Sequence, residues 1–179
     1  MIFIGRFQPF HLAHLAVINE AFKHSRQVIV LLGSAQPERT LKNIFNTDER
    51  EQMILSAFDT EQQQRIKFGA LIDVYDDVKW TKAVKQAVAE IVQGHTKKVG
   101  LIGHFKDQSS YYLALFPDWQ LVELENFYYL SATPIREKYL NGELPDLNQV
   151  PESTLKFLTD FQHTVHYETL QKQYQQHSH

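Results

Sequence analysis

The chain has 179 residues, enough for one domain with a sizeable core, and its composition of 43% hydrophobic and 22% charged residues is that of an ordinary globular domain. The net charge of −3 gives no indication of a strongly basic face for long nucleic acid. The absence of cysteine excludes disulfides, thiolate zinc sites and a cysteine nucleophile. No apolar run reaches the length of a membrane span and no leader pattern is present, so we expect a cytoplasmic protein with no membrane partner.

Apolar runs and helical spacing alternate along the chain. The strands predicted from continuous apolar runs are 1–5, 28–32, 66–74, 99–102 and 120–124. The predicted helices are 11 to about 24, about 47–58 capped by Thr47, 80–92 closed by Gly94, a short one at 111–116, one that starts at Thr133-Pro134 and ends at Gly142, and two after Pro151. The polar segment 35–46 has no periodicity and is expected to be a loop.

This alternation predicts an α/β fold, a Rossmann-like doubly wound parallel sheet with C-terminal helices. We expect a single domain over 1–179, with a helical part at about 151–179. Three predicted strands end at or beside a glycine, namely Gly5, Gly33 (followed by Ser34) and Gly103 (followed by His104). Because ligands bind at the carboxyl ends of parallel strands, these segments should meet at one edge of the sheet.

The segment from Gly5 to His14 joins the first predicted strand to the first helix, through the turn Arg6-Phe7-Gln8-Pro9-Phe10. The glycine lets the backbone approach a ligand, and a helix N-terminus offers N–H groups and partial positive charge to an anion. His11 and His14, at i and i+3, can donate to the same phosphate. A histidine pair alone is more often capping or surface, but the whole combination favours phosphate binding.

A second motif, Ser131-Ala132-Thr133-Pro134-Ile135-Arg136, opens the helix before Gly142. Thr133 is a plausible N-cap, and Arg136 falls in the first turn, where a cation is unfavourable against the helix dipole. A surface arginine is an equally good interpretation of this segment alone. Together with a phosphate, the guanidinium and the helix N-terminus would share one anion.

The two motifs resemble the nucleotidylyltransferase superfamily, which carries an early HxxH or TxxH signature and a late [ST]xTxxR signature. Residues 5–11, the run Gly33-Ser34-Ala35-Gln36 and the run 45–50 resemble the archaeal-type nicotinamide mononucleotide adenylyltransferases, a group that includes bacterial enzymes with a C-terminal Nudix domain. The segment with Gly103, His104, Asp107 and Ser109 resembles the bifunctional branch. No Nudix signature occurs in the chain, so a stand-alone transferase and the transferase half of a longer parent chain both stay open.

The resemblance implies adenylyl transfer from ATP to nicotinamide mononucleotide (NMN), giving NAD and pyrophosphate. It implies catalytic roles for His11, His14 and Arg136, phosphate contacts for Arg6 and Arg50, and stacking of the nicotinamide on Trp80, although Trp80 could also be core. The further expected substrate-binding residues are Gly5, Phe7, Gln8, Gly33, Ser34, Gly103, His104, Asp107, Ser131 and Thr133. Mg²⁺ held mainly by the ATP phosphates is expected, without a protein cage, and so is self-association.

Two positions depart from the family pattern: Ala13 replaces a glycine between the histidines, and Asp76 stands where asparagine is common. An aspartate near the acceptor should disfavour the acid form of the mononucleotide by like-charge repulsion. Other acceptors stay open, among them nicotinate mononucleotide, phosphopantetheine, a cytidylyl acceptor and flavin mononucleotide. A non-catalytic sensor of NAD or ATP is the alternative from a different class.

Overall fold

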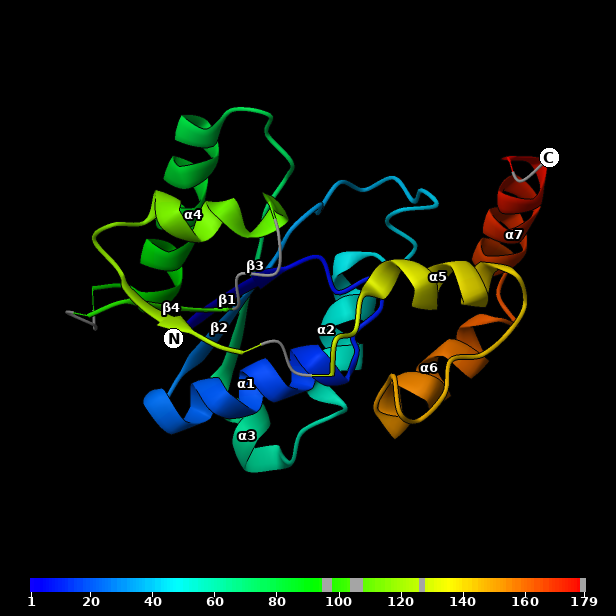
Figure 1. Cartoon of the computed structure of the whole chain (residues 1–179), viewed down its shortest axis with the longest axis horizontal. Coiled ribbons are helices and arrows are strands. Elements are labelled where there is room, and N and C mark those ends of the chain that lie inside the picture. Colours follow the sequence, from blue (N-terminus) through cyan, green and yellow to red (C-terminus); the bar gives the residue numbers. More distant parts are fainter. Residues whose placement is uncertain (95–97, 104–107, 126–127, 178–179) are drawn as a thin grey trace.

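The computed structural model describes residues 1–94, 98–103, 108–125 and 128–177, with side chains omitted for 108–111. Its centre is a sheet of parallel strands (Figure 1), and their order is β3-β2-β1-β4-β5. The strands are β1 (Ile2–Gly5), β2 (Val28–Leu32), β3 (Ile66–Ala70), β4 (Gly100–Gly103) and β5 (Gln120–Glu123). This order and direction confirm the predicted Rossmann-like fold.

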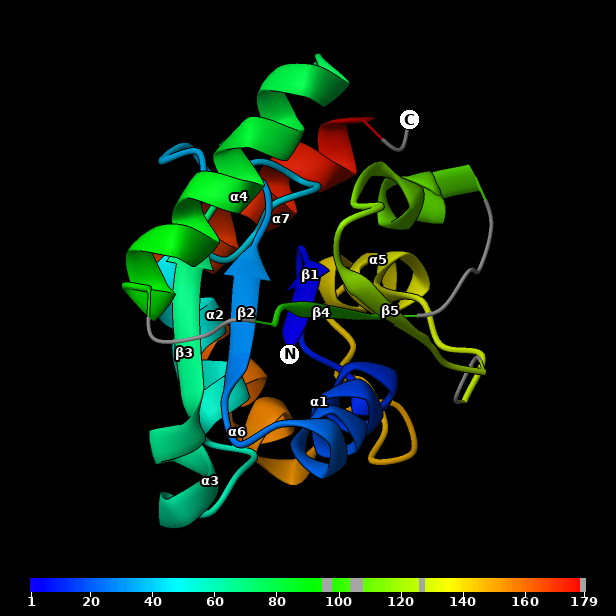
Figure 2. The ribbon, with the colours of Figure 1, turned by 90° about the vertical axis from the view of Figure 1, so that its left-hand side faces the viewer.

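Both faces of the sheet are buried at its central strands β1, β2 and β4, where alternate side chains point to opposite sides and meet helices on each. On β2, Val30 packs into a core with α1 and α2, whereas Leu31 packs into a second core with α4 and η1. Figure 2 shows α4 covering one face, while α1 and α2 lie on the other. A parallel sheet buried in this way requires continuously apolar strands, which is why 28–32 could be placed from sequence without error.

The helices are α1 (Leu12–His24), α2 (Thr47–Leu55), α3 (Thr60–Arg65), α4 (Asp77–Val92), the 3-10 helix η1 (Gln108–Leu115), α5 (Ala132–Leu140), α6 (Glu152–Phe161) and α7 (Val165–His177). The two predicted C-terminal helices are therefore confirmed. Helix α3 was not predicted, because its sequence TEQQQR has no apolar stripe. It forms behind a reciprocal cap in which Asp59 accepts from the Gln62 N–H and Gln62 accepts from the Asp59 N–H.

The start of α2 at residue 47 is as predicted but its cap is not, and the predicted starts of α4 and α5 are wrong by three residues and by one. Asn46, not Thr47, caps α2, because its side chain accepts the Glu49 N–H at 2.9 Å. Asp76 accepts the Lys79 N–H at 2.8 Å and starts α4 at residue 77 rather than 80. Ser131 rather than Thr133 is the N-cap of α5, although its side chain makes no capping bond. Strand β3 ends at Ala70, short of the predicted 74.

The C-terminal helices hold α5 in place through two buried tyrosines. The hydroxyl of Tyr139 donates to the carbonyl of Leu158 at 2.8 Å, and the hydroxyl of Tyr167 donates to the carbonyl of Tyr139 at 2.7 Å. Helices α5, α6 and α7 accordingly gather beside one end of the sheet (Figure 1). No helix in the described part of the chain is long and apolar enough to cross a membrane.

Candidate active site

The turn that follows β1 and the turn that follows β2 lie side by side at the carboxyl edge of the sheet. The Gly33 N–H donates to the carbonyl of Gly5 at 2.8 Å and so links them. Phe7 and Ser34 have φ angles of 52° and 50°, in the left-handed region that side chains other than glycine rarely adopt. Such residues persist where surrounding contacts hold them, and they cluster at functional sites.

The ring of Phe7 gives a different reason for Gly5 than the one expected from sequence. A Cβ atom on Gly5 would lie 2.9 Å from Cζ of Phe7, whose side chain is buried. Gly5 therefore makes room for a core aromatic ring. The ring of Phe7 packs inside the protein beneath the turn and is not presented to a substrate. A Cβ on Gly33 would meet its nearest atom at 3.6 Å, an ordinary contact.

The two histidines stack face to face at the start of α1, with ring centroids 3.5 Å apart and planes 15° from parallel. The backbone N–H of His11 donates to Nδ1 of His14 at 3.3 Å. A neutral ring whose Nδ1 accepts a hydrogen bond carries its proton on Nε2, so His14 presents Nε2 as a donor. The rings of Phe7 and Phe10, 4.8 Å and 5.8 Å away, fix the orientation of His14.

The N-terminus of α1 is less open to an anion than the sequence suggested. Its first N–H, on Leu12, donates to the carbonyl of Gln149 at 2.9 Å. The histidine side chains, rather than this backbone donor, are the groups that the segment offers to a phosphate.

Arg136 reaches this edge from the first turn of α5. Arg136 is 7% exposed, and its guanidinium donates to the carbonyl of Gln8 at 3.1 Å and to Oγ1 of Thr133 at 3.4 Å. Burial, and next the positive charge of Arg6, lowers the pKa of Arg136. The neighbouring positive charges of Arg6 and Arg136 favour binding of an anion between them.

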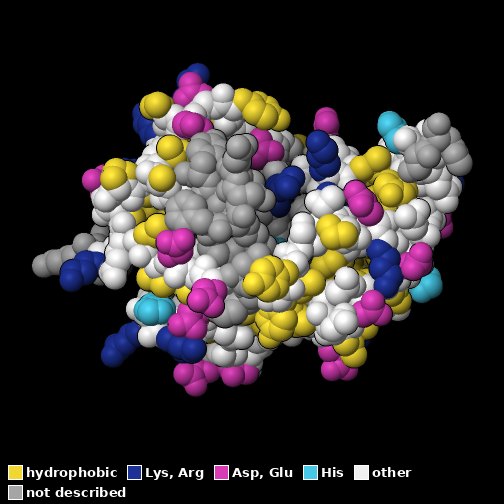
Figure 3. All heavy atoms as spheres, in the orientation of Figure 1, with side chains coloured by type: hydrophobic (Ala, Val, Ile, Leu, Met, Phe, Trp, Pro, Cys, Tyr) yellow, Lys and Arg dark blue, Asp and Glu magenta, His cyan; other side chains and the backbone are white. Residues whose placement is uncertain are grey.

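Arg6 and Arg136 line an open pocket of about 390 Å³, large enough for a nucleotide polyphosphate. Its other lining residues are Leu41, Lys42, Thr133, Glu137, Leu140, Tyr174 and His177. Lys and Arg side chains stand beside the hollow near the centre of the face in Figure 3. Lys42 lies in the predicted loop 35–46 and was not predicted as a site residue. Nothing in the local sequence of α7 signals that Tyr174 and His177 reach this pocket.

Arg50 does not contact the pocket, contrary to the sequence-based prediction. Its side chain is 1% exposed and donates to the carbonyls of Arg6 at 2.9 Å, Gly33 at 2.6 Å and Asn46 at 3.1 Å, with a longer contact to that of Ser34 at 3.4 Å. Burial lowers the pKa of Arg50 to about 10, so the group stays charged at neutral pH. Arg50 therefore links the turn after β1 to the turn after β2 from the protein interior, through the carbonyls of Arg6 and Gly33.

Gln8 has a similar structural role. Its side-chain amide donates to the carbonyl of Phe45 at 2.7 Å and accepts the N–H of the same residue at 2.9 Å. The amide is thus fully used inside the protein, and only the backbone carbonyl of Gln8, bound by Arg136, faces the catalytic groups.

The predicted acceptor residue Trp80 lies at the start of α4, which packs with η1 on the sheet face opposite α1 and α2, and it does not line the pocket of Arg6 and Arg136. Trp80 is partly buried and meets Tyr112 and Phe116 edge to face, at centroid distances of 5.7 Å and 5.8 Å. Gly103 ends β4, where an added Cβ would lie 3.4 Å from a methyl group of Leu113. The predicted residues His104 and Asp107 lie outside the described residues.

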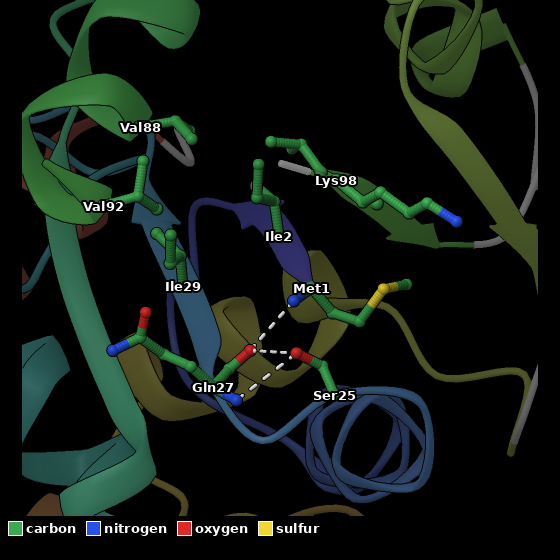
Figure 4. A pocket seen from close by; sticks show the side chains of 10 residues that line it. Met1, Ile2, Ser25, Gln27, Ile29, Val88, Val92 and Lys98 are labelled. Atoms are coloured by element: carbon green, nitrogen blue, oxygen red, sulfur yellow. Dashed lines mark hydrogen bonds between the residues drawn. The ribbon is translucent and has the colours of Figure 1, made fainter. Parts of the chain in front are cut away.

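A smaller pocket lies at the amino end of the sheet, away from all the predicted site residues. Figure 4 shows Met1, Ser25, Gln27 and Lys98 around it, with the amine of Met1 donating to the carbonyl of Gln27 at 2.8 Å. Among the described residues, Arg6, His11, His14 and Arg136 lie instead at the carboxyl edge, as the topology predicts.

Sequence comparisons agree with this geometry. The model of the cytidylyltransferase-like family matches residues 2–138. A protein of Acinetobacter baylyi named nicotinamide/nicotinic acid mononucleotide adenylyltransferase is 53% identical over 175 residues, covering 97% of this chain and 92% of the relative. A protein of Thermococcus onnurineus named nicotinamide-nucleotide adenylyltransferase is 31% identical over 160 residues, covering 89% of this chain and 81% of the relative.

A solved structure shows the same fold at high similarity. The bifunctional NMN adenylyltransferase/ADP ribose pyrophosphatase of Francisella tularensis, complexed with AMP and a manganese ion, matches with a TM-score of 0.81 and 31% identity. The match covers 96% of this chain and 51% of the other, so this chain spans about half of the bifunctional protein. The family model, the two relatives and the shared fold together show that the chain belongs to the cytidylyltransferase-like family.

Proposed function

We propose that this protein transfers the adenylyl group of ATP to nicotinamide mononucleotide, forming NAD and pyrophosphate. The observation that carries the proposal is the stacked pair His11 and His14 at the same sheet edge as the cationic pocket of Arg6 and Arg136. The relatives named above as mononucleotide adenylyltransferases support the choice of donor and acceptor.

The reaction is an in-line displacement at the α-phosphorus of ATP. A phosphate oxygen of the mononucleotide forms the new P–O bond, the bond from the α-phosphorus to the bridging oxygen breaks, and that oxygen leaves with pyrophosphate. The attacking oxygen is already anionic near neutral pH, so no general base is required. Catalysis then depends on positioning and on stabilising charge in the transition state.

Each catalytic side chain has a role that its surroundings favour. His14, with Nδ1 occupied by the His11 N–H, donates from Nε2 to the transferring phosphoryl group, and His11 supports it through the stacked rings. Arg136 and Arg6 neutralise the β- and γ-phosphates and the leaving pyrophosphate, with Thr133 beside them at the start of α5. Arg50 and Gln8 keep the turns in shape without touching the nucleotide.

The expected Mg²⁺ is treated as part of the substrate, as MgATP. Among the described residues, no group of three or more His, Asp or Glu side chains comes together to hold a metal ion. We expect its ligands to come chiefly from the phosphates, an arrangement that suits Mg²⁺. Bound in this way, the ion supplies neutralising charge to the polyphosphate.

The acceptor is proposed to bind against the wall of Trp80, where the indole face suits a cationic pyridinium ring. The name of the Acinetobacter relative covers both the amide and the acid mononucleotide. The carboxylate of Asp76, in the loop before Trp80, favours the amide by charge. Self-association, a Nudix domain in a longer parent chain and a cytoplasmic location stay predictions.

The deciding experiment is a turnover assay with ATP, Mg²⁺ and either nicotinamide or nicotinate mononucleotide, detecting the dinucleotide and pyrophosphate. We expect rapid turnover that favours the amide. Turnover with flavin mononucleotide or phosphopantetheine and not with either pyridine mononucleotide would replace the acceptor. ATP binding without turnover on any of these acceptors would support a non-catalytic sensor instead.

A further inference from the structure

The loop that joins β2 to α2 contains a closed turn, from Thr40 to Asn43, that borders the pocket of Arg6 and Arg136. The N–H of Thr40 donates to the carbonyl of Asn43, and the N–H of Asn43 donates back to the carbonyl of Thr40, each at 3.1 Å. The same Asn43 N–H reaches Oγ1 of Thr40 at 3.1 Å. These bonds leave Leu41 and Lys42 at the tip, and both residues line the pocket of Arg6 and Arg136.

An ion pair braces the base of this turn. Arg39 donates from Nη1 and Nη2 to the two carboxylate oxygens of Glu49, at 2.6 Å and 2.8 Å, and from Nη1 to the carbonyl of Ile44 at 2.7 Å. The two side chains are 17% and 20% exposed, and the guanidinium lies 5.5 Å from the ring centre of Phe161. A shielded, bidentate pair of this kind holds its geometry better than an exposed one.

The chain after the turn is tied to the catalytic segment. The side-chain amide of Gln8 binds both the N–H and the carbonyl of Phe45, and the backbone carbonyl of Gln8 accepts from Arg136. Glu49 also accepts the N–H of Asn46 at 2.9 Å. The turn is therefore fastened to α2 and to the turn after β1, so its tip has a defined position relative to Arg136.

Lys42 itself is exposed, and the described part of the chain gives its ammonium no hydrogen bond or ion pair. It shares the pocket with the cations Arg6 and Arg136 and with a single carboxylate, that of Glu137. Like charges repel, so holding Lys42 beside Arg6 and Arg136 costs electrostatic free energy. A polyanion bound among the three cations would remove that cost.

We propose that Lys42 contacts the polyphosphate of ATP and the pyrophosphate product, and that the Arg39–Glu49 ion pair positions it there. The proposal rests on the proposed function only in taking ATP as the donor. It adds to the reaction a phosphate ligand from the loop and a positioning pair behind it. The ammonium acts as a point charge on the β- and γ-phosphates, and carries no proton through the reaction.

The first test measures pyrophosphate binding by calorimetry and the KM for ATP in Lys42→Ala and Lys42→Arg. Removing one charged hydrogen bond should weaken pyrophosphate binding and raise the KM for ATP on the order of tenfold. The KM for the mononucleotide should stay within about twofold, because the acceptor binds at the other wall. Lys42→Arg should recover most of the affinity. Lys67→Ala, which removes an exposed lysine from β3, is the matched control and should change nothing.

The second test asks whether Arg39 acts through Lys42. Arg39→Lys keeps the charge but loses the bidentate pair, and should raise the KM for ATP several-fold with an unchanged mononucleotide KM. In a Lys42→Ala background the same change should have no further effect on that KM. Equal effects in both backgrounds would overturn the positioning role. Glu49→Gln offers the same comparison if Arg39→Lys lowers the melting temperature below that of the assay.

The outcomes separate this proposal from the proposed function. Unchanged pyrophosphate binding and unchanged KM for ATP in Lys42→Ala, with normal NAD synthesis, would overturn the role of Lys42 and keep the function. Weakened pyrophosphate binding in that variant, in a protein that does not transfer to NMN, would keep the role of Lys42 and overturn the acceptor. Absence of pyrophosphate binding by the unmodified protein would overturn the proposal outright.

Discussion

The two walls of the site are built very differently. On the phosphate wall (the turn after β1, residues 33–46 and the start of α5), Gln8 and Arg50 are each 1% exposed and spend their side-chain donors on backbone carbonyls. On the wall proposed for the acceptor (residues 71–80 and η1, called the acceptor wall below), Tyr75 is fully exposed and Val78 is 80% exposed.

This difference indicates which properties of the enzyme can change independently. Phosphate transfer relies on donors that are already aimed, so the phosphate wall needs a rigid supporting network. The exposed side chains of Tyr75 and Val78 leave room for change, so substitutions there should change the choice of mononucleotide without loosening the phosphate wall. The variants below test that separation.

The largest effect is expected from His14→Ala on the phosphate wall. Removing the Nε2 donor should lower kcat on the order of 10²- to 10³-fold, as for other groups that stabilise transition-state charge. Steady-state turnover with ATP and NMN measures the loss, and circular dichroism checks that the fold is kept. His166→Ala, an exposed histidine on α7, should behave like the unmodified protein. Near-normal turnover in His14→Ala would remove the histidine pair from the mechanism.

Arg50→Lys should affect stability more than chemistry. Lysine cannot reach the carbonyls of Arg6, Gly33 and Asn46 together, so the free energy of unfolding should fall by about 3 kcal/mol. Urea denaturation measures this change, and Arg26→Lys on the surface is the control. A variant with unchanged stability and a raised KM for ATP would instead support the direct phosphate contact expected from sequence.

The case of Arg50 shows where sequence-based prediction fails. The strand 28–32 and the parallel fold could be predicted because apolar runs and their alternation with helical spacing are local signals. An arginine that binds phosphate and one that binds carbonyls have the same sequence signature, and only packing between distant segments separates them. For the same reason, no local pattern could place Tyr174 and His177 of α7 beside Arg136.

Gly5 and Gly33, which both lie on the phosphate wall, differ in how much room a side chain would have. Gly5→Ala forces the Phe7 ring away from a Cβ 2.9 Å distant, and should cost about 2 kcal/mol of unfolding free energy. Gly33→Ala has room for its methyl group at 3.6 Å and should lie within about 0.5 kcal/mol of the unmodified protein. Thermal and urea unfolding of both variants measure the difference. Equal losses would mean that steric overlap at Phe7 is not the reason for Gly5.

Trp80→Ala tests the acceptor wall. Loss of the indole face should raise the KM for NMN about tenfold and leave the KM for ATP unchanged. Trp80→Phe keeps an aromatic ring against Tyr112 and Phe116, and should recover part of the affinity. A parallel rise in both KM values, together with lower stability, would assign Trp80 to the core and not to the acceptor.

The smallest effect is expected at Asp76, where capping and selectivity can be separated. Asparagine caps a helix as well as aspartate does, so Asp76→Asn should keep the start of α4 while removing one negative charge. The kcat/KM ratio of nicotinate to nicotinamide mononucleotide should then rise about threefold, the size of an exposed charge interaction. Asp59→Asn makes the same change at the cap of α3, away from the site, and should leave the ratio unchanged. If Asp76→Asn also leaves it unchanged, the carboxylate only caps α4, and the choice between amide and acid is made elsewhere on the acceptor wall.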